Sequence, residues 1–269
     1  MYKLFQTFII LVFTIQCHAS ENAAYSFSIV PQQASSKLAR QWVPVLREVS
    51  RLSGVELKFV TNKNIPTFES ELAQGKHDFS YMNPYHYVVY HDMQGYNALN
   101  KARDKQIKGI IVAHKDSPIS KLEELADQDI AFPSPAAFAA SILPRANLSK
   151  RGIKFTPKYV SSHDSVYRNI AKKHYVAGGG IIRTLNSTDP NTKKDLKILW
   201  TSPGYTPHAI ASHSRVPEEV AKKVQAAFAA LDASEEGRAM LDKLKIKGWE
   251  KAQNSDWDDV RSLNIDLIK

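Results

Sequence analysis

Residues 129–141 have the side-chain types and spacing of an anion site at a strand-to-helix junction. A short apolar strand leads to Ser134, which is suited to the N-cap, and Pro135 suits the first helical position, where no N–H is needed. The next residues are small, so we expect the backbone N–H groups of Ala136 and Ala137 to be uncovered. The helix dipole and these free donors favour an anion. A Ser-Pro helix start also occurs for stability alone.

A similar junction surrounds Asn83. Asn83 is a predicted N-cap, with Pro84 as the first helical residue. Tyr81 and Tyr85 flank this cap and can bring phenol hydroxyls to the same crevice. The alternative is that both rings pack in the core and leave their hydroxyls in water.

A third junction contains Ser162, His163 and Asp164. Ser162 is a predicted helix cap, and His163 can donate a hydrogen bond or, if charged, neutralise a ligand. Asp164 offsets the helix dipole in one interpretation. In the other it contacts the ligand, and a carboxylate next to an anion requires a shared proton. That second interpretation predicts a protonated oxyanion such as hydrogen phosphite.

Two further strand ends complete the predicted set of hydrogen-bond donors around the ligand. Gln32 ends the first strand and can donate an amide hydrogen bond, and the glycines at 178–180 allow close backbone approach after a strand. They match neither a phosphate-binding loop nor a dinucleotide fingerprint. Arg183 is the nearest cation and has an equally plausible place on the surface. We therefore expect neutral donors to provide most of the binding.

Strands and helices alternate along the chain, which indicates an α/β fold of mainly parallel sheets with helices on both faces. Predicted strands are residues 25–30, 56–60, 78–82, 108–113, 130–132, 155–160, 175–177, 196–201 and 208–211. Predicted helices are residues 37–53, 66–74, 84–92, 119–126, 135–151, 163–173, 216–231, 235–243 and 257–267.

The chain has no long linker, so we expect two lobes joined by crossing strands at 108–113 and 207–212. The first lobe is predicted to be discontinuous, comprising residues 24–110 and 208–269. Residues 111–207 form the second lobe. The ligand is expected in a hinged cleft between them, near the carboxyl ends of strands.

The N-terminus resembles a secretory signal. Lys3 precedes an apolar run over residues 4–15, and Ala19 is a suitable last residue before cleavage. We therefore expect residues 1–19 to be a signal peptide and the chain to be exported to the periplasm. The alternative is a lipid anchor on Cys17, which Gln16 disfavours because a small residue is usual there.

The formal net charge of +9 fits either scattered solvated lysines or a field that attracts small anions. No nucleic-acid motif is present.

A hydrolase would need Ser165, His163 and Asp164 to act together, but neighbours on one helical turn cannot easily form a triad. His86 and His91 lack the i, i+4 spacing of a helical metal pair. We expect a binder without catalytic residues, metal or cofactor.

The chain resembles the phosphate-, phosphite- and phosphonate-binding periplasmic proteins of ABC transporters, within the type II periplasmic binding fold. The resemblance is carried by residues 29–33, 68–75, 78–84, 109–117, 131–135 and 162–167. It implies a phosphorus oxyanion held by Ser134, Ala136, Ala137, His163 and Asp164, with Tyr81 and Tyr85 opposite.

The resemblance also implies a partner permease in the inner membrane, and we expect a monomer. A ligand sensor for a membrane receptor or kinase is the alternative function. The sequence departs from the family at Ala136, Ala137 and Phe138, where the familiar loop is richer in Ser and Thr. This departure favours a small oxyanion over a bulky amino-alkyl phosphonate.

Overall fold

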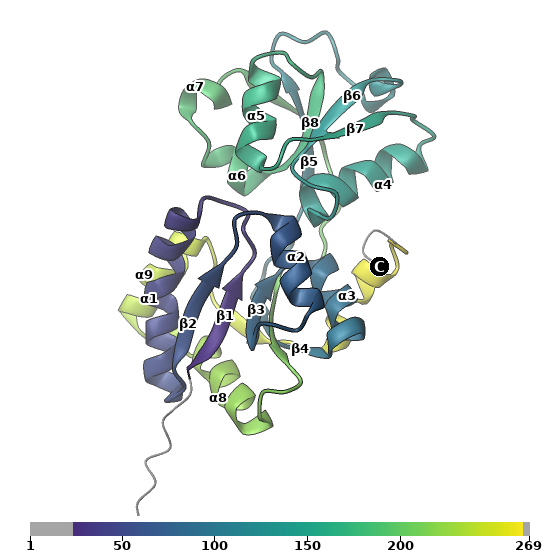
Figure 1. Ribbon diagram of the computed structural model, residues 1–269. Coiled ribbons are helices and arrows are strands. Elements are labelled where there is room, and N and C mark those ends of the chain that lie inside the picture. Colours follow the sequence, from purple (N-terminus) through teal and green to yellow (C-terminus); the bar gives the residue numbers. More distant parts are fainter. Residues whose placement is uncertain (1–23, 266–269) are drawn as a thin grey trace, which may run out of the picture.

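The computed structural model describes residues 24–265, which form two lobes stacked along one axis (Figure 1). The first lobe is built on a six-stranded sheet and the second on a five-stranded sheet. In sheet order, the first contains β11 (Trp249–Lys251), β4 (Tyr96–Ala102), β10 (Ala209–His213), β3 (Phe79–Met82), β1 (Tyr25–Ile29) and β2 (Leu57–Thr61). The second contains β7 (Thr156–Tyr159), β6 (Asp129–Phe132), β8 (Ala177–Ile181), β5 (Gly109–His114) and β9 (Leu196–Thr201).

Helices cover both sheets. The first lobe carries α1 (Ser35–Ser53), α2 (Ile65–Ala73), α3 (Pro84–Gln94), α8 (Glu218–Ala229), α9 (Glu235–Leu244) and α10 (Asp258–Arg261). The second carries a π-helix (Phe138–Ile142) that continues into α4 (Leu143–Lys150), then α5 (His163–Ala171), α6 (Ile182–Asn186) and α7 (Pro190–Lys193). Short 3₁₀ turns lie at Leu122–Leu125, Leu231–Ala233 and Asn254–Trp257. The helix predicted at 119–126 is therefore only one such turn.

Both sheets are mixed, so the expectation of mainly parallel sheets is wrong. The pairs β1–β2, β1–β3, β6–β7 and β6–β8 are parallel. The strands β10 and β5 pair antiparallel with both of their neighbours, and β11 pairs antiparallel with β4. The reason is that β5 and β10, the first strands after each passage between the lobes, enter their sheets in the opposite direction.

The two passages between the lobes are short segments rather than shared strands. Each strand belongs to one sheet, and within residues 24–265 the crossing chain forms a single isolated bridge, between Ile107 and Tyr205. These residues exchange two backbone hydrogen bonds of 2.8 and 3.0 Å. The strands predicted at 108–113 and 207–212 are present as β5 and β10, but each lies within one sheet, so the prediction that they cross between the lobes is wrong. The division into residues 24–110 with 208–269 and 111–207 stays a prediction, although β5 begins at Gly109.

The first lobe has a large aromatic core. Phe27 lies between Trp42, Phe79 and Phe228, with ring-centroid distances of 6.2, 6.1 and 5.5 Å. Trp42 belongs to the buried stripe of α1, which ends at Gly54 in the left-handed conformation (φ 67°). A glycine adopts this conformation without the steric cost of a Cβ atom. This core makes a rigid base for the loops that follow β1 and β3.

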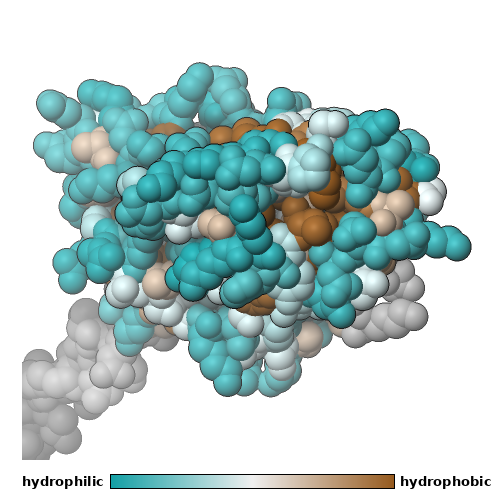
Figure 2. All heavy atoms as spheres, turned by 90° about the horizontal axis from the view of Figure 1, so that it is seen from above, coloured by the Kyte–Doolittle hydropathy of each residue, from teal (hydrophilic) through white to brown (hydrophobic). Residues whose placement is uncertain are grey.

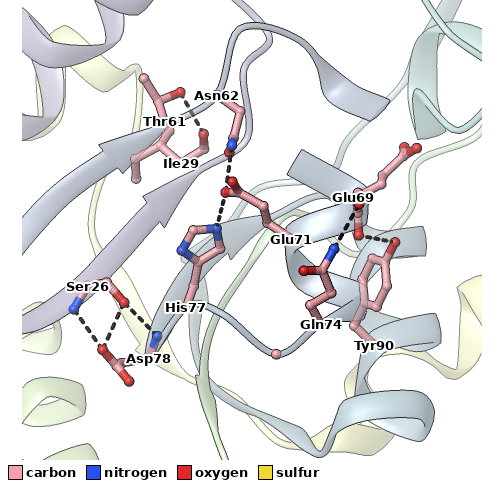
Figure 3. A network of polar contacts seen from close by, with 12 residues as sticks. Ser26, Ile29, Thr61, Asn62, Glu69, Glu71, Gln74, His77, Asp78 and Tyr90 are labelled. Atoms are coloured by element: carbon pink, nitrogen blue, oxygen red, sulfur yellow. Dashed lines mark hydrogen bonds and ion pairs between the residues drawn. The ribbon is translucent and has the colours of Figure 1, made fainter. Parts of the chain in front are cut away.

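Polar contacts tie the strands of the first lobe together at one end (Figure 3). Asp78 Oδ2 accepts hydrogen bonds from the backbone N and Oγ of Ser26, at 2.9 and 2.8 Å. Arg215 donates to the other carboxylate oxygen at 2.8 Å, and together these bonds lower the pKa of Asp78 despite its burial. The contacts connect β1 and β3 with the segment that follows β10.

Hydrophilic residues cover most of the second lobe's outer face (Figure 2). Among residues 24–265, no helix has the length and apolarity needed to cross a membrane. The predicted signal peptide and Cys17 lie outside the described residues.

Candidate functional site

A cavity of about 220 Å³ lies between the lobes, beside the two crossing segments. We call it the inner cavity. The first lobe contributes Tyr81 and His208 to its walls, and the second contributes Ile181 and Arg183. The crossing segment contributes Lys105 to Lys108. The strands β3 and β8 both end here, as predicted for a ligand site at strand carboxyl ends.

Aromatic rings form the first-lobe wall. The Tyr81 ring stacks on His208 with centroids 4.9 Å apart, and it lies 4.7 Å from the Trp42 ring. Burial raises the pKa of the Tyr81 hydroxyl, which therefore stays protonated at neutral pH. A protonated hydroxyl can donate a hydrogen bond to an anion.

Gln32 connects this wall to the opposite lobe. Arg183, at the start of α6, donates to Gln32 Oε1 at 2.9 Å. The amide nitrogen of Gln32 lies 3.0 Å from His208 Nε2. Because an amide N–H donates, His208 Nε2 accepts and the neutral ring carries its proton on Nδ1. The predicted residue Gln32 thus organises two side chains that are distant in sequence.

The inner cavity is electropositive. Arg183 and Lys105 line it, and its described lining residues include no carboxylate. Burial, aided by the charge of Arg183, lowers the pKa of Lys105 to about 8. Burial also lowers the pKa of His208 well below its ordinary value, and the nearby Arg183 and Lys105 lower it further. Both effects are typical of cations gathered in a partly dehydrated space, where an anion is favoured.

The turn around Ser134 differs from the prediction. Residues 133–137 form a turn with Ala137 N donating to Ser134 O at 3.4 Å, and the helix begins only at Phe138. Ser134 therefore does not cap a helix, and no side chain caps the π-helix. The Ser134 side chain is buried (5 % exposed), and its Oγ has no hydrogen-bond partner among the described residues.

Close backbone packing explains why the helix begins late. A Cβ atom on Gly109 of β5 would lie 2.1 Å from the Ala139 carbonyl oxygen, and one on Gly179 of β8 would lie 1.9 Å from that of Ala140. The π-helix therefore lies directly on two glycine-containing strands. The glycines at 178–180 lie within β8 and not after it, so their close approach is to the chain's own backbone and side chains.

Asn83 and Tyr85 have structural contacts. Asn83 caps α3 as predicted, accepting from His86 N at 2.8 Å. Its amide nitrogen donates to the Ala136 carbonyl at 3.1 Å, which links the two lobes. The Tyr85 hydroxyl donates to Ile265 O at 3.3 Å, so it is directed toward the C-terminal segment. Neither residue lines the inner cavity.

Ser162 caps α5 as predicted, accepting from Ser165 N at 3.1 Å. His163 is buried (2 % exposed), and its Nδ1 lies 3.2 Å from Thr184 Oγ1. Burial lowers the pKa of His163 to about 4, so the ring is neutral at pH 7. Its Nε2 has no partner among the described residues. Asp164 is exposed and does not line the inner cavity, so proton sharing with a ligand gains no support.

The prediction missed His208 and Lys105 and gave Arg183 too little weight. Each lies outside a recognisable local motif, and sequence separations of 176 and 151 residues divide Gln32 from His208 and Arg183. The sequence offers no clear signal for them, since Asp104 directly precedes Lys105 and nothing local distinguishes Arg183 from a surface arginine. Among the described residues, no group of His, Cys, Asp and Glu is arranged to hold a metal ion.

The family model described as "ABC transporter, phosphonate, periplasmic substrate-binding protein" matches residues 27–257. The phosphate-import protein PhnD of Mycolicibacterium smegmatis is 24% identical over 227 residues, which cover 76% of this chain and 70% of the relative. The phosphonates-binding periplasmic protein of Escherichia coli is 22% identical over 258 residues, or 86% of this chain and 72% of the relative.

The structure of PhnD1 from Prochlorococcus marinus in complex with methylphosphonate has a similar fold. Its TM-score is 0.81 at 16% identity, and the match covers 90% of this chain and 97% of that one. The predicted two-lobed type II periplasmic binding fold is thus confirmed. Since the family model spans the chain from β1 to the end of the 3₁₀ turn Asn254–Trp257, this chain belongs to the family of periplasmic substrate-binding proteins of phosphonate ABC transporters.

Proposed function

We propose that this chain binds a small phosphorus oxyanion (phosphonate, phosphite or phosphate) in the inner cavity and delivers it to an inner-membrane permease. The observation that carries the proposal is the charge of the cavity, where Arg183 and Lys105 face no carboxylate among the described lining residues. Charge-assisted hydrogen bonds to an oxyanion are about twice as strong as neutral ones. The names of the relatives, a phosphate importer and a phosphonate binder, support the same ligand class.

Two neutral donors of the second lobe do not line the inner cavity in this conformation but would reach the ligand when the lobes close on it. Ser134 Oγ and His163 Nε2 are buried without partners among the described residues. A buried polar atom without a partner costs roughly 1–3 kcal/mol, which a hydrogen bond to the ligand would offset. Tyr81 and Gln32 would bind from the first lobe. Ser162 and the backbone of Ala136 and Ala137 would act by fixing the second-lobe turns.

Ligand binding would close the hinge. The bonds Gln32–Arg183 and Asn83–Ala136 already connect the lobes. A ligand that contacts both lobes favours the closed state by its difference in affinity for the two states. The closed form, as a monomer exported to the periplasm by the signal peptide, would be the one that the permease recognises.

Catalysis is not part of the proposal. Ser165 Oγ lies 2.9 Å from Ser162 Oγ, and His163 Nδ1 faces Thr184, so the three residues of the alternative hydrolase do not form a relay. A phosphate ester incubated with the protein should therefore show no turnover. Turnover that disappears in Ser165→Ala would contradict this part of the proposal.

Thermal unfolding with added ligands tests the binding class. A ligand at about 100 times its dissociation constant should stabilise the folded protein by ~2.7 kcal/mol. We expect a rise in Tm with at least one of phosphate, phosphite, methylphosphonate and 2-aminoethylphosphonate, and none with sulfate. A protein that responds to none of the four phosphorus compounds would contradict the proposed function.

A further inference from the structure

A second cavity of about 410 Å³ adjoins the inner cavity. We call it the outer groove. Lys105, Ile182 and Arg183 line both spaces, so a ligand in one would lie beside the other. The remaining walls come from both lobes, with Lys37 on α1, Asn186 on α6, and Lys243 and Lys245 at the end of α9.

The outer groove carries five basic side chains, from Lys37, Lys105, Arg183, Lys243 and Lys245. Its described lining residues include no aspartate or glutamate. None of the five forms an ion pair within residues 24–265, whereas Arg51, Lys115 and Arg215 elsewhere each pair with a carboxylate within 3 Å. Unpaired cations collected in one concave space raise the local concentration of anions.

The base of the outer groove is held in place by hydrogen bonds. Lys105 Nζ donates to the Lys245 carbonyl at 2.7 Å, and the Gln41 amide donates to the Lys243 carbonyl at 3.3 Å. Lys245 itself has a left-handed backbone (φ 57°) at the end of α9, a position where glycine is usual. A lysine there strains the backbone, and it places a cation at the groove.

Resting on the proposed function, we infer that the preferred ligand carries a second anionic group. Its phosphorus oxyanion lies in the inner cavity, and a carboxylate or second phosphoryl group lies in the outer groove. The same charges disfavour a ligand with an ammonium group, because neither cavity offers it a carboxylate among the described lining residues. The substrate class is therefore carboxy-phosphonates and related dianionic compounds.

Isothermal titration calorimetry on the chain without the predicted signal peptide tests the inference. The probes are phosphonoacetate and 3-phosphonopropionate, each paired with the methyl ketone that replaces its carboxylate. Methylphosphonate and 2-aminoethylphosphonate complete the series. Of the two carboxylates, we expect the one that binds more tightly to bind about tenfold tighter than its own ketone. A ratio of this size corresponds to roughly one partly screened charge interaction. 2-Aminoethylphosphonate should bind more weakly than methylphosphonate.

A double variant locates the effect. Lys243→Gln with Lys245→Asn removes two groove charges, and asparagine tolerates the left-handed backbone. The tenfold ratio of acid to ketone should fall to about twofold. The matched control is Lys223→Gln with Lys173→Asn. Lys223 is an exposed helical lysine, Lys173 has the same backbone (φ 60°), and neither lines the two cavities. The control should retain the full ratio.

Three results distinguish failure of this inference from failure of the proposed function. If methylphosphonate binds and both acids bind no tighter than their ketones, the inference is wrong and the proposed function stands. If the ratio persists in the groove variant, the second anion is not bound in the outer groove and the inference is also wrong. If no phosphorus compound binds, phosphate and phosphite included, the proposed function is wrong and the inference with it.

Discussion

The two walls of the inner cavity are built in different ways. The first-lobe wall consists of large rings, with Tyr81 packed between Trp42 and His208 above an aromatic core. Behind the second-lobe wall, backbone lies directly on backbone, with the π-helix seated on glycines of β5 and β8. The second lobe contributes Arg183 to the cavity wall, whereas its unpartnered Ser134 Oγ and His163 Nε2 do not line the cavity.

The first lobe therefore provides the shape of the binding surface, and the second lobe provides its charge. Rigid rings give the first lobe a fixed surface, whose packing depends on side-chain volume. The second lobe presents a cation and polar atoms, whose positions depend on how closely helix and sheet backbones approach. We therefore expect second-lobe changes to affect either stability through the glycines or affinity through the polar atoms.

The largest expected effect is on the close packing of the second lobe. Gly179→Ala places a Cβ 1.9 Å from a backbone carbonyl and 2.7 Å from the Phe132 ring, so backbone must move. We expect a loss of about 3 kcal/mol or more in the free energy of unfolding, measured with urea. Gly152→Ala is the control, because its Cβ meets open space and only its positive φ costs about 1 kcal/mol. Equal losses in both variants would refute the packing argument.

Burial of His163 predicts a pH dependence. Its folded-state pKa of about 4 is below the unfolded value, so the unfolded chain binds the proton more readily. The stability from a neutral His163 is complete above pH 6.5 and is lost as the pH falls toward 4. The loss approaches ~3 kcal/mol. Urea unfolding between pH 7 and 4.5 should show a shallower decline in His163→Gln, and parallel curves would contradict the prediction.

Arg183→Gln tests the charge of the second-lobe wall. We expect the affinity for a phosphorus oxyanion to fall by about 2–3 kcal/mol, since a charged hydrogen bond is lost from a partly buried site. Calorimetric titration measures it. Arg168→Gln, an exposed arginine on α5, is the control and should change affinity by less than about 0.5 kcal/mol. Comparable losses in the two variants would indicate only a general effect of net charge.

Ser134→Ala separates binding from stability. We expect it to weaken binding by about 1–3 kcal/mol, because the hydroxyl would bond a charged ligand. The ligand-free protein should keep its stability or gain slightly, since a buried oxygen without a partner in the described chain is removed. Affinity that is unchanged within error would remove Ser134 from the site.

The smallest effect is expected at Asp164. Because its side chain is exposed and outside the inner cavity, Asp164→Asn should change affinities for phosphate and phosphite by less than about 0.5 kcal/mol. Both affinities can be measured in one titration series. A clear shift in favour of fully ionised phosphate would restore the hypothesis of a shared proton.

Local chemistry in the sequence determined much of the first lobe and the caps. Asn83 and Ser162 cap helices as predicted because a cap bonds a backbone N–H only three residues away. The helix at 37–53 ends at Gly54 for an equally local reason. The strands β4 and β11 were not predicted, because their local sequence patterns are weak. Both are specified by pairing with strands that are distant in sequence.

Only the tertiary structure decided the site. Ser134 has the sequence of a cap, yet the helix begins at Phe138 because the carbonyls of its first turn must fit against Gly109 and Gly179. Arg183, His208 and Gln32 meet through bonds that span more than a hundred residues. The sequence determines local backbone preferences within a turn of chain, whereas the cavity depends on how two sheets pack and where the chain passes between them.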